Sequence, residues 1–332
     1  MTTPAHHDKR GGFRNPWPGS ALHGFGGFLK WMLTRPRPKS TGEYPRVTEN
    51  KSDSRKSLSR PTDVTSITWV GHSTFLIQVG DTTILTDPIW SDRASPVSFA
   101  GPRRIAQPGI ALEDLPQIDI TILSHDHYDH LDDATVQTLI KKFPAMSWLT
   151  PIGVGEFLRA RGATSVKELD WWNETELGSA IVGCTPAQHF SGRYPWNRNG
   201  TLWCGWTIRV GDTAVFFAGD TGLHPEFGSI AERFGPFDIS ILPIGAYEPR
   251  WFMHPVHMSP EEAIAAFHAI QATQPERESV MVGSHWGTFR LTDEPVDEPP
   301  VLARRAWERA SLPSDKLWIL THGETRVVKK PF

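Results

Sequence analysis

Short apolar runs alternate with amphipathic stretches along the chain from residue 65 onward. The apolar runs are rich in β-branched residues and predict strands at Ser66–Val70, Thr74–Val79, Thr82–Thr86, Ile118–Leu123, Ala180–Thr185, Ala214–Gly219, Ser279–Ser284 and Leu317–Leu320. Helical patterns lie between them, over Asp133–Lys142, Gly153–Arg161, Pro225–Arg233, Pro260–Gln271 and Pro300–Ser311. This alternation favours a layered α/β fold over an all-β sandwich.

Residues 1–40 carry a different pattern, in which large apolar side chains recur at helical spacing ahead of a basic cluster. The apolar positions are Leu22, Phe25, Leu29 and Met32, with Phe28 and Trp31 beside them, and Arg35, Arg37 and Lys39 follow. Such a segment suits a membrane interface, but it can equally pack on the core, and the sequence leaves both uses open. The polar stretch from Lys39 to Thr62 predicts a linker. We therefore expect an N-terminal extension over residues 1–62 and a folded domain over 63–332.

Length and cysteine content narrow the class of protein. A chain of 332 residues can bury one large core, or one domain plus an extension. No apolar run approaches the roughly 18 residues that a membrane-spanning helix requires, and the N-terminus lacks the basic-then-apolar order of a secretory signal. Cys184 and Cys204 are the only cysteines. A single bridge between them is possible, but we expect two buried free thiols and a reducing cytoplasm as the location.

Charge is distributed unevenly along the chain. Residues 1–60 hold 12 of the 34 basic and 4 of the 37 acidic residues, a balance of +8, which leaves a balance of −11 for the remainder. An acidic main domain repels a polyanion, so we do not expect nucleic acid as a partner.

The most informative motif is the run SHDHYDHLD at residues 124–132, directly after a predicted strand. It places His125, His127 and His130 close together, with Asp129 among them. Neutral imidazoles and carboxylates are ligands that a borderline divalent ion such as Zn²⁺ accepts. The spacing suggests two ions, one held by the first two histidines and one held by Asp129 and His130.

Three further candidate ligands also stand just past the ends of predicted strands. They are His189, Asp220 and His285. Layered α/β folds commonly build their sites at the carboxyl ends of strands. Any one of these residues taken alone is more often structural, but the same arrangement at several strand ends indicates a shared metal site.

Longer motifs resemble a known family. The histidine run followed by His189, Asp220 and His285 resembles the signature of the metallo-β-lactamase superfamily. Several segments are similar to its N-acyl-phosphatidylethanolamine-hydrolysing phospholipase D branch: WVGHST at 69–74, LTDPI at 85–89, ELDWW at 168–172, FAGDTG at 217–222, RFGPFD at 233–238, PIGAYEPRWFM at 243–253 and SHWGTF at 284–289. The resemblance covers residues 65 to 325.

The resemblance implies a metallo-β-lactamase-like αβ/βα four-layer sandwich with a basic N-terminal extension, and two zinc ions. In that arrangement the first ion is held by His125, His127 and His189, the second by Asp129, His130 and His285, and Asp220 bridges them. Two such cations share a hydroxide and lower its pKa, which makes it the expected nucleophile. Asp87 follows its own predicted strand. It either orients the histidine loop or simply forms a turn before the next proline.

The expected catalytic residues are Asp129 and Asp220, through the ions, and two further histidines. His257 and His322 are candidates for protonating the leaving group, because imidazole donates a proton near neutral pH. The resemblance places His257 near the substrate, and His322 follows a strand-like run. Each histidine also has an ordinary structural interpretation. Arg250 can pair with phosphate or tie down its own loop.

The resemblance further implies a zinc-dependent phosphodiesterase of phospholipase D type, which converts N-acyl-phosphatidylethanolamine to an N-acylethanolamine and phosphatidic acid. A metallo-hydrolase of a soluble phosphodiester or of a lactone is the alternative enzyme. A noncatalytic lipid- or metal-binding protein is the alternative outside the enzymes. A phospholipid substrate leads us to expect peripheral contact with the inner face of a membrane, and a homodimer stays open.

Overall fold

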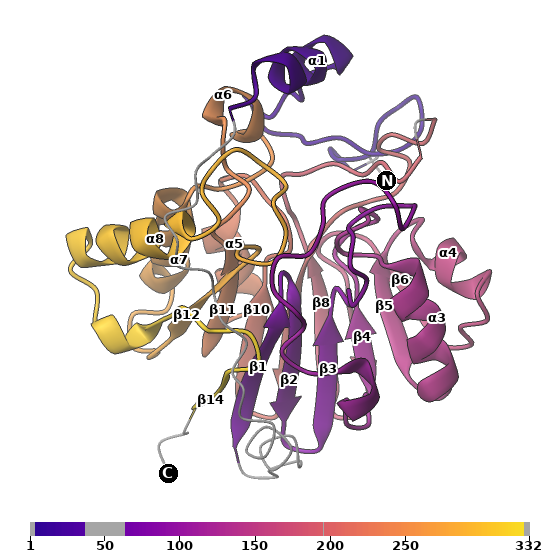
Figure 1. Cartoon of the computed structure of the whole chain (residues 1–332). Helices are drawn as coiled ribbons and strands as arrows, with labels where there is room; N and C mark the ends of the chain where they lie inside the picture. The colour runs from indigo at the N-terminus through magenta and orange to yellow at the C-terminus, as the bar shows by residue number, and fades with distance from the viewer. Residues whose placement is uncertain (1–3, 37–63, 195, 329–332) are drawn as a thin grey trace.

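The strands form two sheets that pack face to face in the computed structural model, which describes residues 4–36, 64–194 and 196–328 (Figure 1). Helices cover the outer face of each sheet, so the layers run helix, sheet, sheet, helix. This arrangement confirms the expected α/β sandwich. The predicted linker from Lys39 to Thr62 lies outside the described residues, and the division of the chain at residue 62 stays a prediction.

The first sheet has the strand order β14-β1-β2-β3-β4-β5-β6. Its strands are β1 (Thr65–Gly71), β2 (Thr74–Val79), β3 (Thr82–Thr86), β4 (Ile120–Ile122), β5 (Ser147–Pro151), β6 (Val166–Leu169) and β14 (Thr325–Val328). The strands from β14 to β3 pair antiparallel, whereas β3, β4, β5 and β6 are parallel. The carboxyl ends of β3 and β4 therefore lie at the same end of the sheet, where the histidine run begins.

The second sheet has the strand order β13-β12-β11-β10-β9-β8-β7. Its strands are β7 (Glu174–Leu177), β8 (Ala180–Thr185), β9 (Gly205–Val210), β10 (Thr213–Phe217), β11 (Ile239–Pro243), β12 (Val280–Ser284) and β13 (Leu317–Trp318). Two antiparallel steps give β8 and β10 the same direction, and β11, β12 and β13 run parallel to β10. The segments that follow β8, β10 and β12 consequently emerge at one end of the sheet.

The helices fall into three groups (Figure 1). Those on the outer face of the first sheet are α3 (Asp133–Lys142) and α4 (Gly155–Arg159), and those on the second sheet are α5 (Phe227–Phe234), α7 (Pro260–Ala272) and α8 (Glu298–Arg309). At one end of the sandwich, α1 (Phe25–Thr34) lies against α6 (Arg250–Met253). Short 3-10 turns occur at Leu112–Asp114 and Ser314–Lys316.

Most predicted elements are present. The strands β2, β3 and β8 and the helix α3 have the predicted bounds, and the other predicted helices of the domain begin and end within two residues of the prediction. Two predicted strands are shorter by at least two residues: β4 covers only Ile120–Ile122 and β13 only Leu317–Trp318. The strands β5, β6, β7, β9, β11 and β14 were not predicted.

The strands β1 to β4 of the first sheet are buried on both faces. Phe75 and Ile77 of β2 belong to the core between the sheets, together with Trp206 of β9. Leu76, between them in the sequence, points to the other face and packs with Leu139 of α3. Because successive side chains of a strand point to opposite faces, both sides must be apolar here. This explains why these strands read as continuous apolar runs.

The N-terminal residues 4–36 pack on the domain. Trp31 of α1 is buried, and its Nε1 donates to Asp293 Oδ2 at 2.7 Å, while Arg35 pairs with the other carboxylate oxygen at 2.6 Å. Leu29 remains 47% exposed and Leu33 78% exposed. This N-terminal arm, residues 4–36, thus packs on the core through Trp31 and leaves an apolar face in solvent.

Two other expectations bear on the class of protein. Cys184 and Cys204 are both buried and both carry free thiols, as predicted. Within the described ranges, every helix is too short or too polar to cross a lipid bilayer.

Candidate metal centre

The candidate ligands of the first sheet are held by the loop that follows β4. Asp87, just past β3, is buried and accepts three hydrogen bonds: from Ser124 N at 2.7 Å, from Ser124 Oγ at 2.6 Å and from His130 Nδ1 at 2.7 Å. These bonds fix both the start of the loop and the ring of His130. The geometry agrees with the expected orienting role of Asp87.

In three of the candidate ligand histidines, a hydrogen bond at Nδ1 leaves Nε2 to face the other candidate ligands. His130 donates Nδ1–H to the carboxylate just described, and His189 donates Nδ1–H to the Val256 carbonyl at 3.0 Å. His125 Nδ1 lies 2.9 Å from Ser124 Oγ, which gives its own hydrogen to the carboxylate and therefore accepts from His125. In the neutral form of these three imidazoles, Nε2 carries a lone pair.

The histidines predicted to hold the first ion come together. His125 Nε2 lies 2.8 Å from His127 Nδ1, and His189 Nε2 lies 3.2 Å from the same atom. The lone pairs on the Nε2 atoms of His125 and His189 are thus directed at His127 Nδ1. Ring nitrogens that approach this closely repel one another unless a hydrogen or a cation lies between them.

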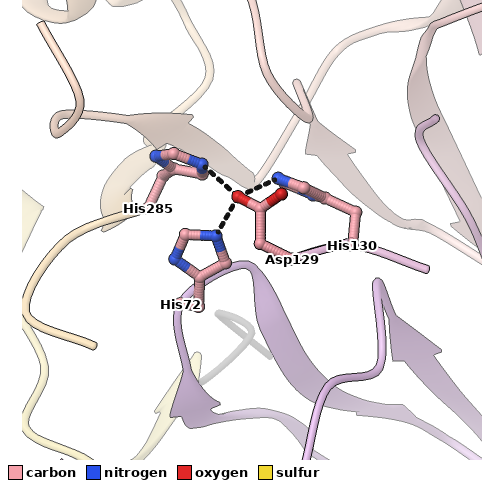
Figure 2. A group of neighbouring side chains, drawn as sticks. All are labelled: His72, Asp129, His130 and His285. Atoms are coloured by element: carbon pink, nitrogen blue, oxygen red, sulfur yellow. Dashed lines mark hydrogen bonds and ion pairs between the residues drawn. The ribbon is translucent and has the colours of Figure 1, made fainter. Parts of the chain in front are cut away.

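Asp129, His130 and His285 form the second group (Figure 2). The Nε2 atoms of the two histidines lie 3.4 and 3.5 Å from Asp129 Oδ2, and both lie 3.1 Å from Asp220 Oδ2. The same Asp220 oxygen is 3.8 Å from His189 Nε2 in the first group. Asp220 therefore stands between the two groups, where a bridging carboxylate is expected.

The buried charges of this cluster perturb one another. Burial lowers the pKa of His127 to about 4 and that of His189 to about 3. Against the effect of burial, Asp220 raises the pKa of His285 to about 9. Also against burial, His130 and His285 hold the pKa of Asp220 well below its usual value. The buried carboxylate thus requires positive charge beside it, which a divalent cation provides in place of protons on these rings.

A metal ion fits this set of donors. His130 Nε2, His285 Nε2 and Asp220 Oδ1 are buried and lack hydrogen-bond partners among the described residues. Imidazole nitrogens and carboxylate oxygens are the donors that zinc and similar divalent ions accept. All the ligands predicted from the sequence converge here, in overlapping groups of donor atoms.

The other predicted site residues have different surroundings. His257 faces the centre: its Nδ1 lies 4.0 Å from Asp220 Oδ2, and this atom has no hydrogen-bond partner among the described residues. His322 is fully buried, its Nε2 lies 2.9 Å from Thr288 Oγ1, and the structure does not bring it to the ligands. Arg250 donates to the His257 carbonyl at 3.0 Å and pairs with a glutamate of α7, so it ties down its own loop.

One residue of the cluster was not predicted as part of the site. His72 follows β1, and its Nε2 lies 2.9 Å from Asp129 Oδ2 (Figure 2). The sequence contains a signal for it, because His72 stands just past the carboxyl end of a predicted strand, as the predicted ligands do. Burial lowers the pKa of His72 to about 3, so the ring is neutral near pH 7.

A cavity of about 850 Å³ opens above the ligands. Its polar wall contains five residues discussed above, namely His127, Asp129, His189, Asp220 and His257. Its apolar wall comes from the N-terminal arm and α6, through Phe28, Trp31, Phe252 and Met253, with Phe190 beside the ligands. Such a cavity can hold a ligand that joins a polar group to a long apolar chain.

Comparisons with known proteins agree with this geometry. The family model for the beta-lactamase superfamily domain matches residues 82–286. The chain is 42% identical to the N-acyl-phosphatidylethanolamine-hydrolyzing phospholipase D 1 of Caenorhabditis elegans, over 70% of this chain and 67% of that protein. It is 34% identical to the mitochondrial N-acyl-phosphatidylethanolamine-hydrolyzing phospholipase D of Saccharomyces cerevisiae, over 70% of this chain but only 49% of the yeast protein.

A solved structure extends the comparison of the fold. Igni18, a metallo hydrolase of Ignicoccus hospitalis, superposes with a TM-score of 0.59 at 22% identity, over 81% of this chain and the whole of that protein. At this identity the match supports the fold alone.

Proposed function

We propose that this chain, which belongs to the beta-lactamase superfamily and within it to the N-acyl-phosphatidylethanolamine-hydrolysing phospholipase D branch, hydrolyses N-acyl-phosphatidylethanolamine with two bound zinc ions. Its family and relatives support a metal-dependent hydrolase. The observation that carries the proposal is the cavity itself, where the ligand cluster forms one wall and apolar side chains form another. The products are an N-acylethanolamine and phosphatidic acid.

The chemistry follows from the placement of the side chains. Two bound ions would neutralise the phosphate oxygens and activate a water molecule for attack on phosphorus. The bond that breaks joins phosphorus to the ethanolamine oxygen, and that oxygen then needs a proton. His257 lines the cavity beside Asp220 and is the proposed donor. Burial lowers the pKa of His257 well below its usual value, and a bound phosphodiester anion beside it would raise that pKa again.

Peripheral membrane contact is part of the proposal. Phe28 of α1 lines the cavity, and Leu29 and Leu33 of the same helix are exposed. Trp251 of α6 is 41% exposed and lies under the ammonium group of Lys30 at 4.7 Å. Apolar side chains beside a cation suit a lipid interface. A phospholipid held at this surface would face the mouth of the cavity.

Metal content and a substrate panel test the proposal together. We expect about two zinc ions per chain, as a bimetallic site requires, and loss of metal in Asp220→Ala. The purified protein is then incubated with N-acyl-phosphatidylethanolamine, phosphatidylcholine and a water-soluble phosphodiester. Cleavage of the soluble ester alone would refute the lipid assignment, and a single tightly held ion would refute the binuclear centre. Two ions with no cleavage of any substrate would favour a noncatalytic binding protein.

A further inference from the structure

The backbone of His72 is held from both sheets. His72 has a φ of +56°, in the left-handed region that residues other than glycine rarely adopt. Its N–H donates to Thr288 Oγ1 at 2.7 Å, and its carbonyl accepts from Trp69 Nε1 at 2.9 Å and from His285 N at 3.1 Å. His72 lies between β1 and β2 of the first sheet, whereas Thr288 and His285 follow β12 of the second. Such an over-determined conformation is typical of functional sites.

The ring of His72 meets ligands of both sheets as well. Its Nε2 lies 2.9 Å from Asp129 Oδ2, and its ring centroid lies 4.1 Å from that of His285 (Figure 2). The other ring nitrogen, Nδ1, is buried without a hydrogen-bond partner among the described residues. The hydrogen of the neutral ring therefore belongs on Nε2, where the carboxylate accepts it.

The distances distinguish His72 from the ligands beside it. His130 Nε2 and His285 Nε2 each lie 3.1 Å from the bridging Asp220 and also approach Asp129. Among the ion pairs of the described residues, His72 forms one with Asp129 and none with Asp220. His72 therefore contacts the same Asp129 oxygen that His130 and His285 approach, at hydrogen-bond distance, but it makes no ion pair with the bridging carboxylate among the described residues.

His285 depends on this contact more than the other ligands do. The Nδ1 atoms of His125, His130 and His189 are fixed by hydrogen bonds, but Nδ1 of His285 is buried without a partner among the described residues. Contact with the ring of His72, and the hydrogen bond from His285 N to the His72 carbonyl, restrain it instead.

We propose that His72 is a positioning residue, which fixes Asp129 through its Nε2–H and His285 through its carbonyl and ring. It thereby sets the spacing between a ligand of the first sheet and a ligand of the second. This proposal rests on the proposed metal centre, and it assigns His72 no direct contact with substrate or with an ion.

Metal affinity of three proteins tests the proposal. His72→Phe keeps a ring against His285 but removes the donor, and His72→Gln restores an N–H near the position of Nε2. Each metal-free protein is titrated with zinc in competition with a chelator of known affinity. Groups that orient metal ligands typically change affinity 10–100-fold. We expect H72F to bind one of the two ions about 10–100-fold more weakly, and H72Q to recover most of that loss.

Controls separate positioning from a general effect on the fold. His224 is another buried histidine, stacked on Phe227 and outside every candidate ligand group of the described residues. His224→Phe should bind both ions as the wild type does. Far-ultraviolet circular dichroism confirms that each variant is folded. If H72F does not fold, the smaller substitution His72→Ala, which also removes the donor, carries the test in a double-mutant cycle with Asp129→Asn, because groups that act through one another show non-additive effects.

The outcomes are distinguishable. If H72F binds both ions with wild-type affinity, or if H72Q binds no better than H72F, His72 does not act through its donor and the proposal is wrong. Additive effects of the His72 and Asp129 substitutions would overturn it in the same way. Wild-type protein that binds fewer than two ions would overturn the binuclear centre, and the role of His72 with it.

Discussion

Replacing Asp87 by Asn tests whether one buried carboxylate organises the histidine loop. Its Oδ2 accepts from both Ser124 Oγ and His130 Nδ1, and its Oδ1 accepts from Ser124 N. The amide of the substituted side chain has only one acceptor oxygen. If that oxygen takes the place of Oδ2, the bonds from Ser124 Oγ and His130 Nδ1 are kept, but the amide NH₂ group then points at Ser124 N, which is also a donor. A hydrogen bond to a charged group contributes about 1.5–3 kcal/mol. In the other orientation the amide donates to His130 Nδ1, which moves the hydrogen of that ring to Nε2, the atom that faces Asp220.

Since 1.4 kcal/mol corresponds to a tenfold change in an equilibrium constant, Asp87→Asn should weaken zinc binding by about 10–100-fold. The assay is titration of metal-free protein with zinc against a competing chelator. Asp119→Asn is the matched control, because Asp119 accepts from Thr83 N at 2.8 Å at the opposite end of β4. It should lower the melting temperature and leave zinc affinity unchanged. Equal zinc affinity in the wild type and Asp87→Asn would refute the reasoning.

Other parts of the molecule give three more tests. The double substitution Leu29→Asp and Leu33→Asp should weaken sedimentation with anionic phospholipid vesicles while zinc content stays constant, and unchanged sedimentation would contradict contact through α1. His257→Gln should lower kcat on the lipid substrate by about 10²–10⁴-fold with both ions retained, and an unchanged kcat would exclude proton donation by His257. Burial lowers the pKa of His224 from 6.5 to about 3, so its stabilising contribution is present above pH 6.5 and is lost as the pH falls toward 3. The free energy of unfolding, measured with urea, should therefore fall less between pH 6.5 and pH 3 in His224→Phe than in the wild type. An equal fall in the two proteins would contradict this prediction.

The positions of the candidate ligands could be predicted because each depends on one strand and the segment just after it. His125 and His130 follow an apolar run that is recognisable locally. His189, Asp220 and His285 follow β8, β10 and β12, which all run in one direction, so their ends meet. The period and composition of a strand indicate where its carboxyl end lies, even when its neighbours in the sheet are unknown.

The same reasoning does not place His322. It follows β13, a strand of two residues at the edge of the second sheet. The chain then crosses to the first sheet, where β14 pairs with β1, and this brings His322 against Trp69 in the interior. The end of a strand faces a central site only when the strand lies within the sheet, and sheet order cannot be inferred from local pattern. The polar strands β6 and β7 were missed for a related reason, because each lies at an edge and carries charged residues.

The contacts that orient each candidate ligand show how the two sheets are joined at the site. Within the first sheet, Asp87 and Ser124 fix His130 and His125, and within the second, the Val256 carbonyl fixes His189. The hydrogen bonds on these ring nitrogens therefore come from the same half of the molecule as the ligands themselves. His285 lacks such a bond on its Nδ1 among the described residues, and its restraint comes across the interface from the His72 loop. The site is thus complete only when the sheets are packed in register, and the proposed role of His72 follows from this, because its contacts with His285 join a ligand of the second sheet to the first.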